Sequence, residues 1–180
     1  MSEYLKANVS DAPYFVTLTA VGWIDVFTRE AYSKELIKNL AFCQDNRGLE
    51  IYAYVLMPSH LHMICRRKAA AGLLSDLLRD FKSYTAKQLM KMIAENEQES
   101  RKEWLLHLFK YYAKFTKQNK EMMFWQKTSH PVELYSNKMI EQKLEYIHQN
   151  PVKAGIVIEP WAYLYSSACT ESPLKVLDAW

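Results

Sequence analysis

Two histidines separated by one residue, His60 and His62, are the side chains of this sequence best placed to share a metal ion. The segments Leu49–Met57 and His60–Arg66 predict two strands, joined as a hairpin by a turn at Pro58–Ser59. Because side chains alternate faces along a strand, both imidazoles would point the same way. Two surface histidines without a metal have the same spacing, so the pair alone indicates only a candidate site.

A second group of reactive side chains lies near the end of a predicted helix that runs from Ser136, its N-cap, to Gln149. Tyr146 and Asn150 are four residues apart and would share one helical face. A tyrosine there is a candidate nucleophile, and Asn150, or alternatively Gln149, would offer an amide oxygen to a metal. Pro151 is expected to end the helix. The competing interpretation is a tyrosine that only packs and an asparagine that only terminates the helix.

Three further elements would form the scaffold for these residues. The β-branched and aromatic segment Pro13–Val21 predicts a first strand. A helix is expected from about Arg29 to Asn46, with Thr28 as its cap and Gly48 just after its end. Another long helix is expected from Leu73 to about Ile93.

The remaining sequence is harder to assign to regular structure. The charged stretch Glu95–Met122 is interpreted as a helical insertion or an irregular arm, and the tail after Gly155 as a short strand or an extended packing segment. The element order favours a single α+β domain over residues 1–180, with a helical insertion at about 95–122. We expect a ferredoxin-like antiparallel sheet with helices packed on one face.

Composition sets broad limits on function. The chain of 180 residues is 49% hydrophobic and carries a net charge of +3, which is too mild to indicate a nucleic-acid partner by itself. Its 3 cysteines are too far apart for a disulfide framework or a zinc CxxC pair. Neither a signal peptide nor an apolar run long enough for a membrane span is visible, so a cytoplasmic protein without membrane contact is expected.

Two segments together resemble the single-tyrosine HUH transposases of the insertion-sequence type. YAYVLMPSHLHMI (Tyr52–Ile64) and EYIHQNPVKAGIV (Glu145–Val157) are most similar to the branch associated with repetitive extragenic palindromes, known as REP. Three other segments fit the same family in order. They are LLRDFKSYTAKQL, FWQKTSHPVEL and WAYLYSSA.

The resemblance implies a transposase that nicks and rejoins single-stranded, hairpin-forming DNA from palindromic repeats. Tyr146 would form a covalent 5′-phosphotyrosine, and His60, His62 and Asn150 would bind Mg²⁺ or Mn²⁺. The resemblance leaves two assemblies open, a monomer and a homodimer. The run Lys127–Pro131 departs from the family pattern after F-W-Q, which puts the DNA contacts of that segment in doubt.

Three lysines, Lys82, Lys87 and Lys127, are candidate phosphate contacts. The run Lys110–Phe115 would either stack bases or pack its aromatic rings inward as part of a helix. Two other functions stay open at this point. One is a nucleic-acid-binding module of the same fold without catalysis, and the other is a metal-dependent hydrolase that activates water instead of Tyr146.

Overall fold

Four antiparallel strands form the sheet in this computed structural model, which describes residues 7, 9, 11–116 and 121–178. The order across the sheet is β2–β3–β1–β4. Their bounds are β1 (Tyr14–Thr19), β2 (Leu49–Leu56), β3 (His60–Arg67) and β4 (Val132–Glu133). The predicted hairpin is therefore present, and β3 is hydrogen-bonded to a neighbour along both of its edges.

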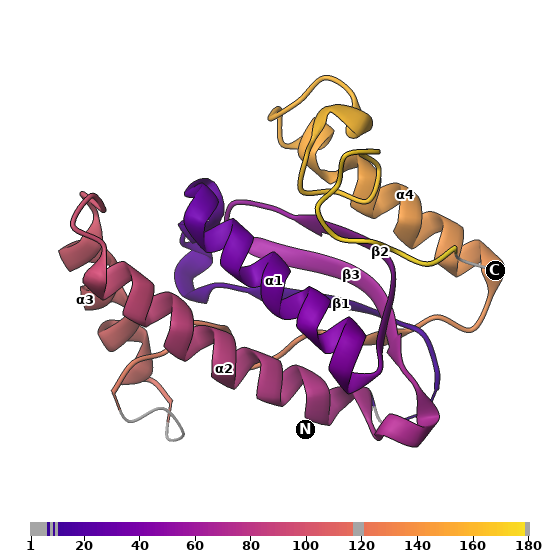
Figure 1. The fold of residues 1–180 in the computed structure, drawn as a ribbon, viewed down its shortest axis with the longest axis horizontal. Helices are drawn as coiled ribbons and strands as arrows, with labels where there is room; N and C mark the ends of the chain where they lie inside the picture. The colour runs from indigo at the N-terminus through magenta and orange to yellow at the C-terminus, as the bar shows by residue number, and fades with distance from the viewer. Residues whose placement is uncertain (1–6, 8, 10, 117–120, 179–180) are drawn as a thin grey trace.

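Helices α1 (Glu30–Arg47) and α2 (Leu74–Glu95) cover one face of this sheet. Leu36 and Leu40 of α1 and Leu89 of α2 are fully buried there with Leu61 and Met63 of β3. Figure 1 shows the two helices side by side in front of the strands. The predicted α+β fold with an antiparallel sheet is confirmed, and burial of this apolar face is its main source of stability.

Helix α4 (Asn137–Lys153) packs against the opposite face and lies apart from α1 and α2 (Figure 1). Its buried residues Ile140 and Ile147 join Phe15 of β1 and Ile64 of β3 in a second, smaller hydrophobic cluster. The expected placement of helices on one face thus describes α1 and α2, and α4 adds a third layer. The sheet separates the two clusters.

Helix α3 (Lys102–Ala113) lies within the predicted insertion, of which residues 117–120 fall outside the described part of the chain. Phe109 is fully buried in the main core, whereas Tyr111 and Phe115 remain exposed. Within the run Lys110–Phe115, Tyr112 is the aromatic ring that packs against the main core, so the predicted inward packing holds for one ring of three.

Two predicted helix boundaries are wrong. Thr28 does not cap α1, because it closes a 3-10 turn and its hydroxyl donates to the carbonyl of Asp25. Helix α4 also continues through Pro151 to Lys153, with the amide of Ala154 donating to the carbonyl of Asn150. Pro151 is buried, and the packing of its ring offsets the backbone hydrogen bond that a proline cannot donate.

Other predicted boundaries agree with the structure. Ser136 caps α4 by accepting a hydrogen bond from the amide of Met139, and Gly48 follows α1 with φ of 70°. That left-handed conformation favours glycine.

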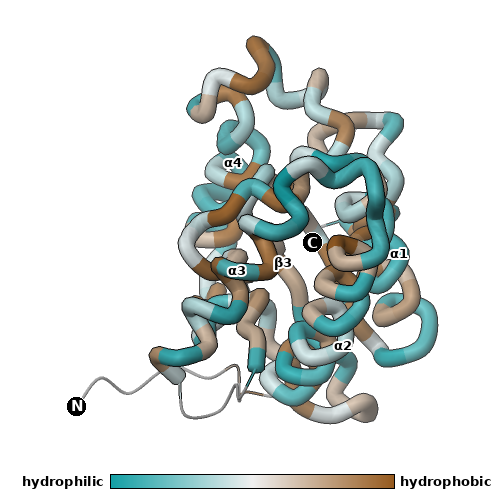
Figure 2. Tube along the Cα trace, turned by 90° about the vertical axis from the view of Figure 1, so that its left-hand side faces the viewer, coloured by the Kyte–Doolittle hydropathy of each residue, from teal (hydrophilic) through white to brown (hydrophobic). Residues whose placement is uncertain are grey.

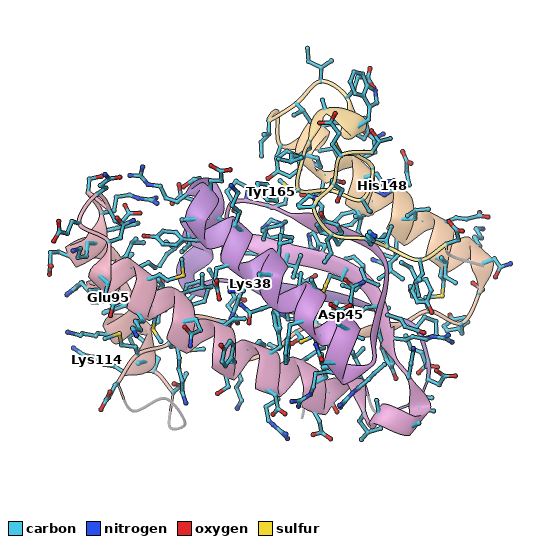
Figure 3. The ribbon with its side chains drawn as sticks, viewed as in Figure 1. Lys38, Asp45, Glu95, Lys114, His148 and Tyr165 are labelled. Carbon is cyan, nitrogen blue, oxygen red and sulfur yellow. The ribbon has the colours of Figure 1, made fainter. Side chains whose placement is uncertain are left out.

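The segment after α4 is the extended packing segment that the sequence allowed. After the 3-10 turn η4 (Pro160–Ala162) it runs along the outer edge of β2, where the amide of Leu56 donates to the carbonyl of Tyr165 and the amide of Ser167 to that of Tyr54. Figure 3 labels Tyr165 on this segment. These bonds cover an edge that would otherwise expose unpaired backbone groups.

Hydropathy along the helices fits this arrangement. In Figure 2, α1 and α2 alternate between hydrophilic and hydrophobic stretches, as expected of helices with one buried side. None of the helices in the described residues is both long and apolar enough to cross a lipid bilayer.

A buried carboxylate connects the end of α2 to the start of α3. The side chain of Glu99 is inaccessible to solvent and lies 3.3 Å from Arg29 Nε and 3.2 Å from Arg101 Nε. Replacing one partner of such a cluster leaves the others without compensation. Since both arginines are partly exposed, we expect Glu99→Ala to lower the free energy of unfolding by about 2 kcal/mol.

Urea denaturation followed by circular dichroism measures this loss. Asp80→Ala is the matched control, because the Asp80 side chain is 49% exposed and its ion pairs with Arg47 and Arg79 are solvated. The control should lose less than about 1 kcal/mol. Equal losses in the two variants would contradict a structural role for the buried cluster.

Candidate active site on the α4 face of the sheet

His60 and His62 lie on the face of the sheet that α4 covers. Their ring centroids are 4.6 Å apart, as expected for alternate residues of one strand. Leu61 and Met63 point to the opposite face and are fully buried in the main core. Because β3 is held along both edges, the two imidazoles are carried by one of the most constrained segments of the chain.

Each imidazole contacts a hydroxyl group through its Nδ1 atom. His62 Nδ1 lies 2.8 Å from Thr17 Oγ1, and His60 Nδ1 lies 3.0 Å from Ser59 Oγ. Thr17 is the residue of β1 directly opposite His62, so strand pairing itself provides this contact. When Nδ1 donates to the hydroxyl oxygen, Nε2 keeps its lone pair, which is the tautomer that binds metals.

Burial keeps both rings neutral. Desolvation lowers the pKa of His60 to about 4. Desolvation, together with the nearby His60 and the positive charge of Lys143, lowers the pKa of His62 to about 3. Neutral imidazoles are the form in which histidine binds divalent cations, so the pair fits a metal ion. Within the described residues, no group of three or more His, Cys, Asp or Glu side chains is placed to hold a metal ion.

Tyr146 of α4 lies beside His62, at one end of this pair of histidines. Its ring centroid is 5.2 Å from that of His62 and 5.8 Å from that of Phe15, both in edge-on arrangements. The side chain remains 39% exposed, so the phenol is not part of the packed interior. The structure thus brings together three of the predicted site residues, His60, His62 and Tyr146, although the strand and the helix that carry them are far apart in the sequence.

The same side of α4 carries two more polar residues. Successive residues of a helix are turned by about 100°, so Asn150 projects about 40° from Tyr146 around the axis, toward the buried side of α4. Gln149 projects about 60° from Tyr146 in the opposite direction, away from that buried side. Continuation of the helix through Pro151 keeps Asn150 on this regular projection. Lys143, three residues before the tyrosine, has its ammonium 4.4 Å from the centroid of Phe15 and 5.5 Å from that of Tyr146.

His148, two residues after Tyr146 on the same helix, faces elsewhere. Its Nε2 lies 2.9 Å from Ser167 Oγ, which belongs to the segment along β2. Figure 3 shows it labelled on α4. This histidine connects the helix to the tail and does not contribute a ligand to the histidine pair.

The three predicted DNA-contacting lysines line one pocket of about 1240 Å³ between α2 and the segment before β4. Lys87 and Lys127 are exposed there. Lys82 donates from Nζ to the carbonyls of Gln126 (2.6 Å) and Lys127 (3.0 Å), and burial lowers its pKa to about 8. Lys82 therefore anchors the 126–127 backbone, while the other two ammonium groups face the pocket's solvent side.

Sequence reasoning missed several residues around the histidine pair. Thr17 had a usable signal, because the alternation in PYFVTLTAV places Phe15, Thr17 and Thr19 on one face of a strand. Lys143 also had one, since it precedes the tyrosine by three positions. Ser59 had none, because a turn residue beside a histidine gives no indication of where its hydroxyl points.

Comparison with known proteins gives the family context of this arrangement. The family model described as "Transposase IS200 like" matches residues 9–122. A solved structure of a REP-associated tyrosine transposase bound to a REP hairpin is 21% identical, covers 93% of this chain and 82% of its own, and has a TM-score of 0.63. A structure of a candidate transposase from Deinococcus radiodurans is 16% identical over 79% of this chain and 93% of its own, with a TM-score of 0.46. No curated protein matches the chain.

The hydroxyl of Thr17 should matter for metal binding. Thr17→Val keeps the shape of the side chain but removes the oxygen that fixes His62 through Nδ1. Loss of such a supporting contact weakens metal affinity by about 10-fold or more. Isothermal titration calorimetry with Mn²⁺ alone measures the change. Thr28→Val, which removes a surface-turn hydroxyl, is the control and should bind like the unmodified chain; an unchanged affinity in Thr17→Val would refute the role.

Proposed function

Since the chain belongs to the IS200-like transposase family, we propose that it cleaves and rejoins single-stranded DNA through a covalent intermediate on Tyr146. The observation that carries this proposal is the position of the Tyr146 ring, 5.2 Å from His62 and on the same face as His60. A nucleophile and two neutral imidazoles are thus available to one phosphodiester. This arrangement favours a catalyst over a binding module that has lost its reactive groups.

In the proposed reaction, the hydroxyl oxygen of Tyr146 attacks the phosphorus atom of the scissile phosphodiester. The phenol gives up its proton to solvent, an O–P bond forms, and the bond between phosphorus and the 3′ oxygen breaks. That oxygen takes up a proton and leaves as a 3′-hydroxyl, while the downstream part of the same strand stays attached through its 5′ phosphate as a 5′-phosphotyrosine. One phosphodiester replaces another, so a second 3′-hydroxyl can reverse the step without ATP.

A phenol is protonated at neutral pH and needs assistance to act as a nucleophile. Lys143 supplies a positive charge beside it, since its ammonium lies 5.5 Å from the ring centroid of Tyr146. A positive charge there would stabilise negative charge that develops at the reacting phosphate during the attack. Lys143 also lies over Phe15, whose ring helps to hold the ammonium in place.

The histidine pair would hold a divalent cation. His60 and His62 would bind it through Nε2, and the amide oxygen of Asn150 is the better candidate than Gln149 for a third protein ligand because of its helical projection. Such an ion polarises the phosphate and neutralises charge that develops on its oxygens. Two imidazoles favour Mn²⁺, whereas Mg²⁺ prefers oxygen ligands, and we propose that either serves.

For the substrate, we propose hairpins formed by palindromic repeats. The REP-associated tyrosine transposase with the same fold is bound to such a hairpin. In the present chain, the pocket beside α2 offers Lys87 and Lys127 for phosphate contacts, and the apolar side chains of Met90 and Trp125 line it as well. Basic groups combined with apolar surface suit a strand whose bases are unpaired.

We also propose that one chain is sufficient for cleavage. Tyr146 contacts the histidine of its own chain, and α4 packs on its own sheet through Ile140 and Ile147. A second copy is therefore not needed to complete the site, which favours the monomer among the two assemblies that the sequence left open.

Tyr146→Phe tests the nucleophile. Incubation of the unmodified chain with hairpin oligonucleotides and Mn²⁺ should give a covalent protein–DNA adduct on denaturing gels, and the variant should give none because it lacks the attacking oxygen. Tyr135→Phe, at a tyrosine that is 81% exposed, is the matched control and should keep the adduct. Cleavage that persists in Tyr146→Phe would instead identify a hydrolase that activates water.

His62→Ala tests the role of the histidine pair in the same assay. This variant should lose the adduct but keep its affinity for the hairpin, because phosphate and shape contacts dominate binding.

Lys87→Ala and Lys127→Ala test the pocket. Each variant should weaken binding of all hairpin sequences to a similar extent and reduce the slope of log affinity against log salt by about 0.7 to 0.9, the value for one lost phosphate contact. Electrophoretic mobility shifts at several salt concentrations measure this slope. Lys38→Ala, at an exposed lysine of α1 labelled in Figure 3, is the control. Unchanged slopes in both pocket variants would place the DNA elsewhere.

A further inference from the structure

A tryptophan lies exposed at the edge of the proposed active site. Trp23 ends the 3-10 turn η1 (Val21–Trp23), which follows β1, and its ring centroid is 5.2 Å from that of His60. The residue is 60% exposed, although its neighbours Val21 and Ile24 are almost fully buried. An indole of this size is normally at least half covered by other side chains, so its exposure beside His60 requires an explanation.

The backbone holds this ring in an uncommon conformation. Gly22 and Trp23 have successive positive φ angles of 61° and 56°, and only glycine adopts such angles easily. A bulky residue stays there only when its surroundings enforce it. Hydrogen bonds on either side do so, since the amide of Val21 donates to the carbonyl of Phe124 and the amide of Trp23 to that of Ala20.

Helix α3 fixes the same turn from behind. A Cβ atom at Gly22 would lie 2.5–2.7 Å from the ring atoms and hydroxyl of Tyr112, so the helix packs directly on the turn. Two residues after Trp23, Asp25 forms an ion pair at 2.8 Å with Arg101, the residue that directly precedes α3. The helix within the insertion therefore acts as a support for the segment that presents Trp23.

The strand register orders the reactive groups along the site. On β1, Thr17 lies opposite His62 and Thr19 lies opposite His60, so the chain reaches Trp23 by continuing past His60. Tyr146 contacts His62 and Phe15, toward the other end of the same row. The nucleophile and the tryptophan thus lie at opposite ends of the histidine pair.

We propose that Trp23 stacks the base of the nucleotide immediately 5′ of the cleaved phosphate. The inference rests on the proposed function, in which the attacking and leaving oxygens lie roughly in line through phosphorus. The leaving 3′ oxygen then points away from Tyr146, toward His60 and Trp23, and it belongs to the 5′ nucleotide. Stacking on an aromatic ring accepts any base and holds the released 3′ end in position for rejoining.

The test is an abasic scan combined with substitution of Trp23. Hairpin oligonucleotides carry a single abasic site at each unpaired position in turn, and affinities are measured in EDTA so that no cleavage occurs. For the unmodified chain, the abasic site 5′ of the cleaved phosphate should lower affinity by about 5- to 100-fold. Trp23→Ala should lower the affinity for intact DNA by the same factor as this abasic site does, and the abasic site should then have no further effect. Trp23→Phe should keep most of the affinity and most of the sensitivity to the abasic site.

Two further variants make the result specific. Gly22→Ala, which forces the turn away from Tyr112, should behave like Trp23→Ala in the scan. Trp161→Ala removes an indole that is 65% exposed on η4 and should leave the scan unchanged. If the abasic site 5′ of the phosphate retains its full effect in Trp23→Ala, the proposal is overturned. If Trp23→Ala instead removes the effect of an abasic site 3′ of the phosphate, the assignment of Trp23 to the 5′ nucleotide is overturned.

The outcome separates this inference from the proposed function. The adduct assay, which identifies the cleaved phosphate, depends on Tyr146 and a metal, whereas the scan in EDTA depends on neither. An adduct without coupling at Trp23 overturns the stacking role alone. Coupling without an adduct supports base stacking and overturns the covalent mechanism.

Discussion

The pairing of β3 along both of its edges is the constraint on which the rest of the site depends. Alternation along this strand sends Leu61 and Met63 into the core under α1 and α2, and the same alternation commits His60 and His62 to the opposite face. A shift of one residue in register would turn the imidazoles into the main core and move the apolar side chains to the α4 face. The large core therefore fixes the orientation of the histidine pair as a direct consequence of its own packing.

Much of this scaffold could be predicted from the sequence because local patterns determine it. The β-branched strands, the hairpin around Pro58 and the helices α1 and α2 appear within a few residues of their expected bounds, and the family is confirmed by the match over residues 9–122. The two-residue strand β4 was not predicted, because two residues carry no periodicity. The course of α4 past Pro151 was missed as well, since it depends on burial against a sheet that the local sequence does not reveal.

In the site as well, features set by neighbouring residues could be predicted, whereas contacts between distant segments could not. The pairing of His60 with His62 follows from strand geometry, and the proximity of Tyr146 was expected only from the resemblance to a family. Roles for these residues and for Asn150 stay predictions, and the proposed experiments address those of Tyr146 and His62. Thr17 beside His62 and Trp23 beside His60 depend on register and on a turn held by α3, and such contacts between distant segments are not encoded in any short motif.

The sheet also divides the molecule into two hydrophobic clusters that have no residue in common among those described. The larger cluster carries most of the buried apolar surface, while the smaller one, around Ile64, Ile140 and Ile147, seats the helix that bears Tyr146. Substitutions that repack one side need not disturb the other, since strand backbones lie between them. Changes of side-chain volume in the α1 and α2 layer can thus be absorbed there without moving the helix that bears Tyr146, so the stability of the chain and the geometry of its reactive face can be altered independently.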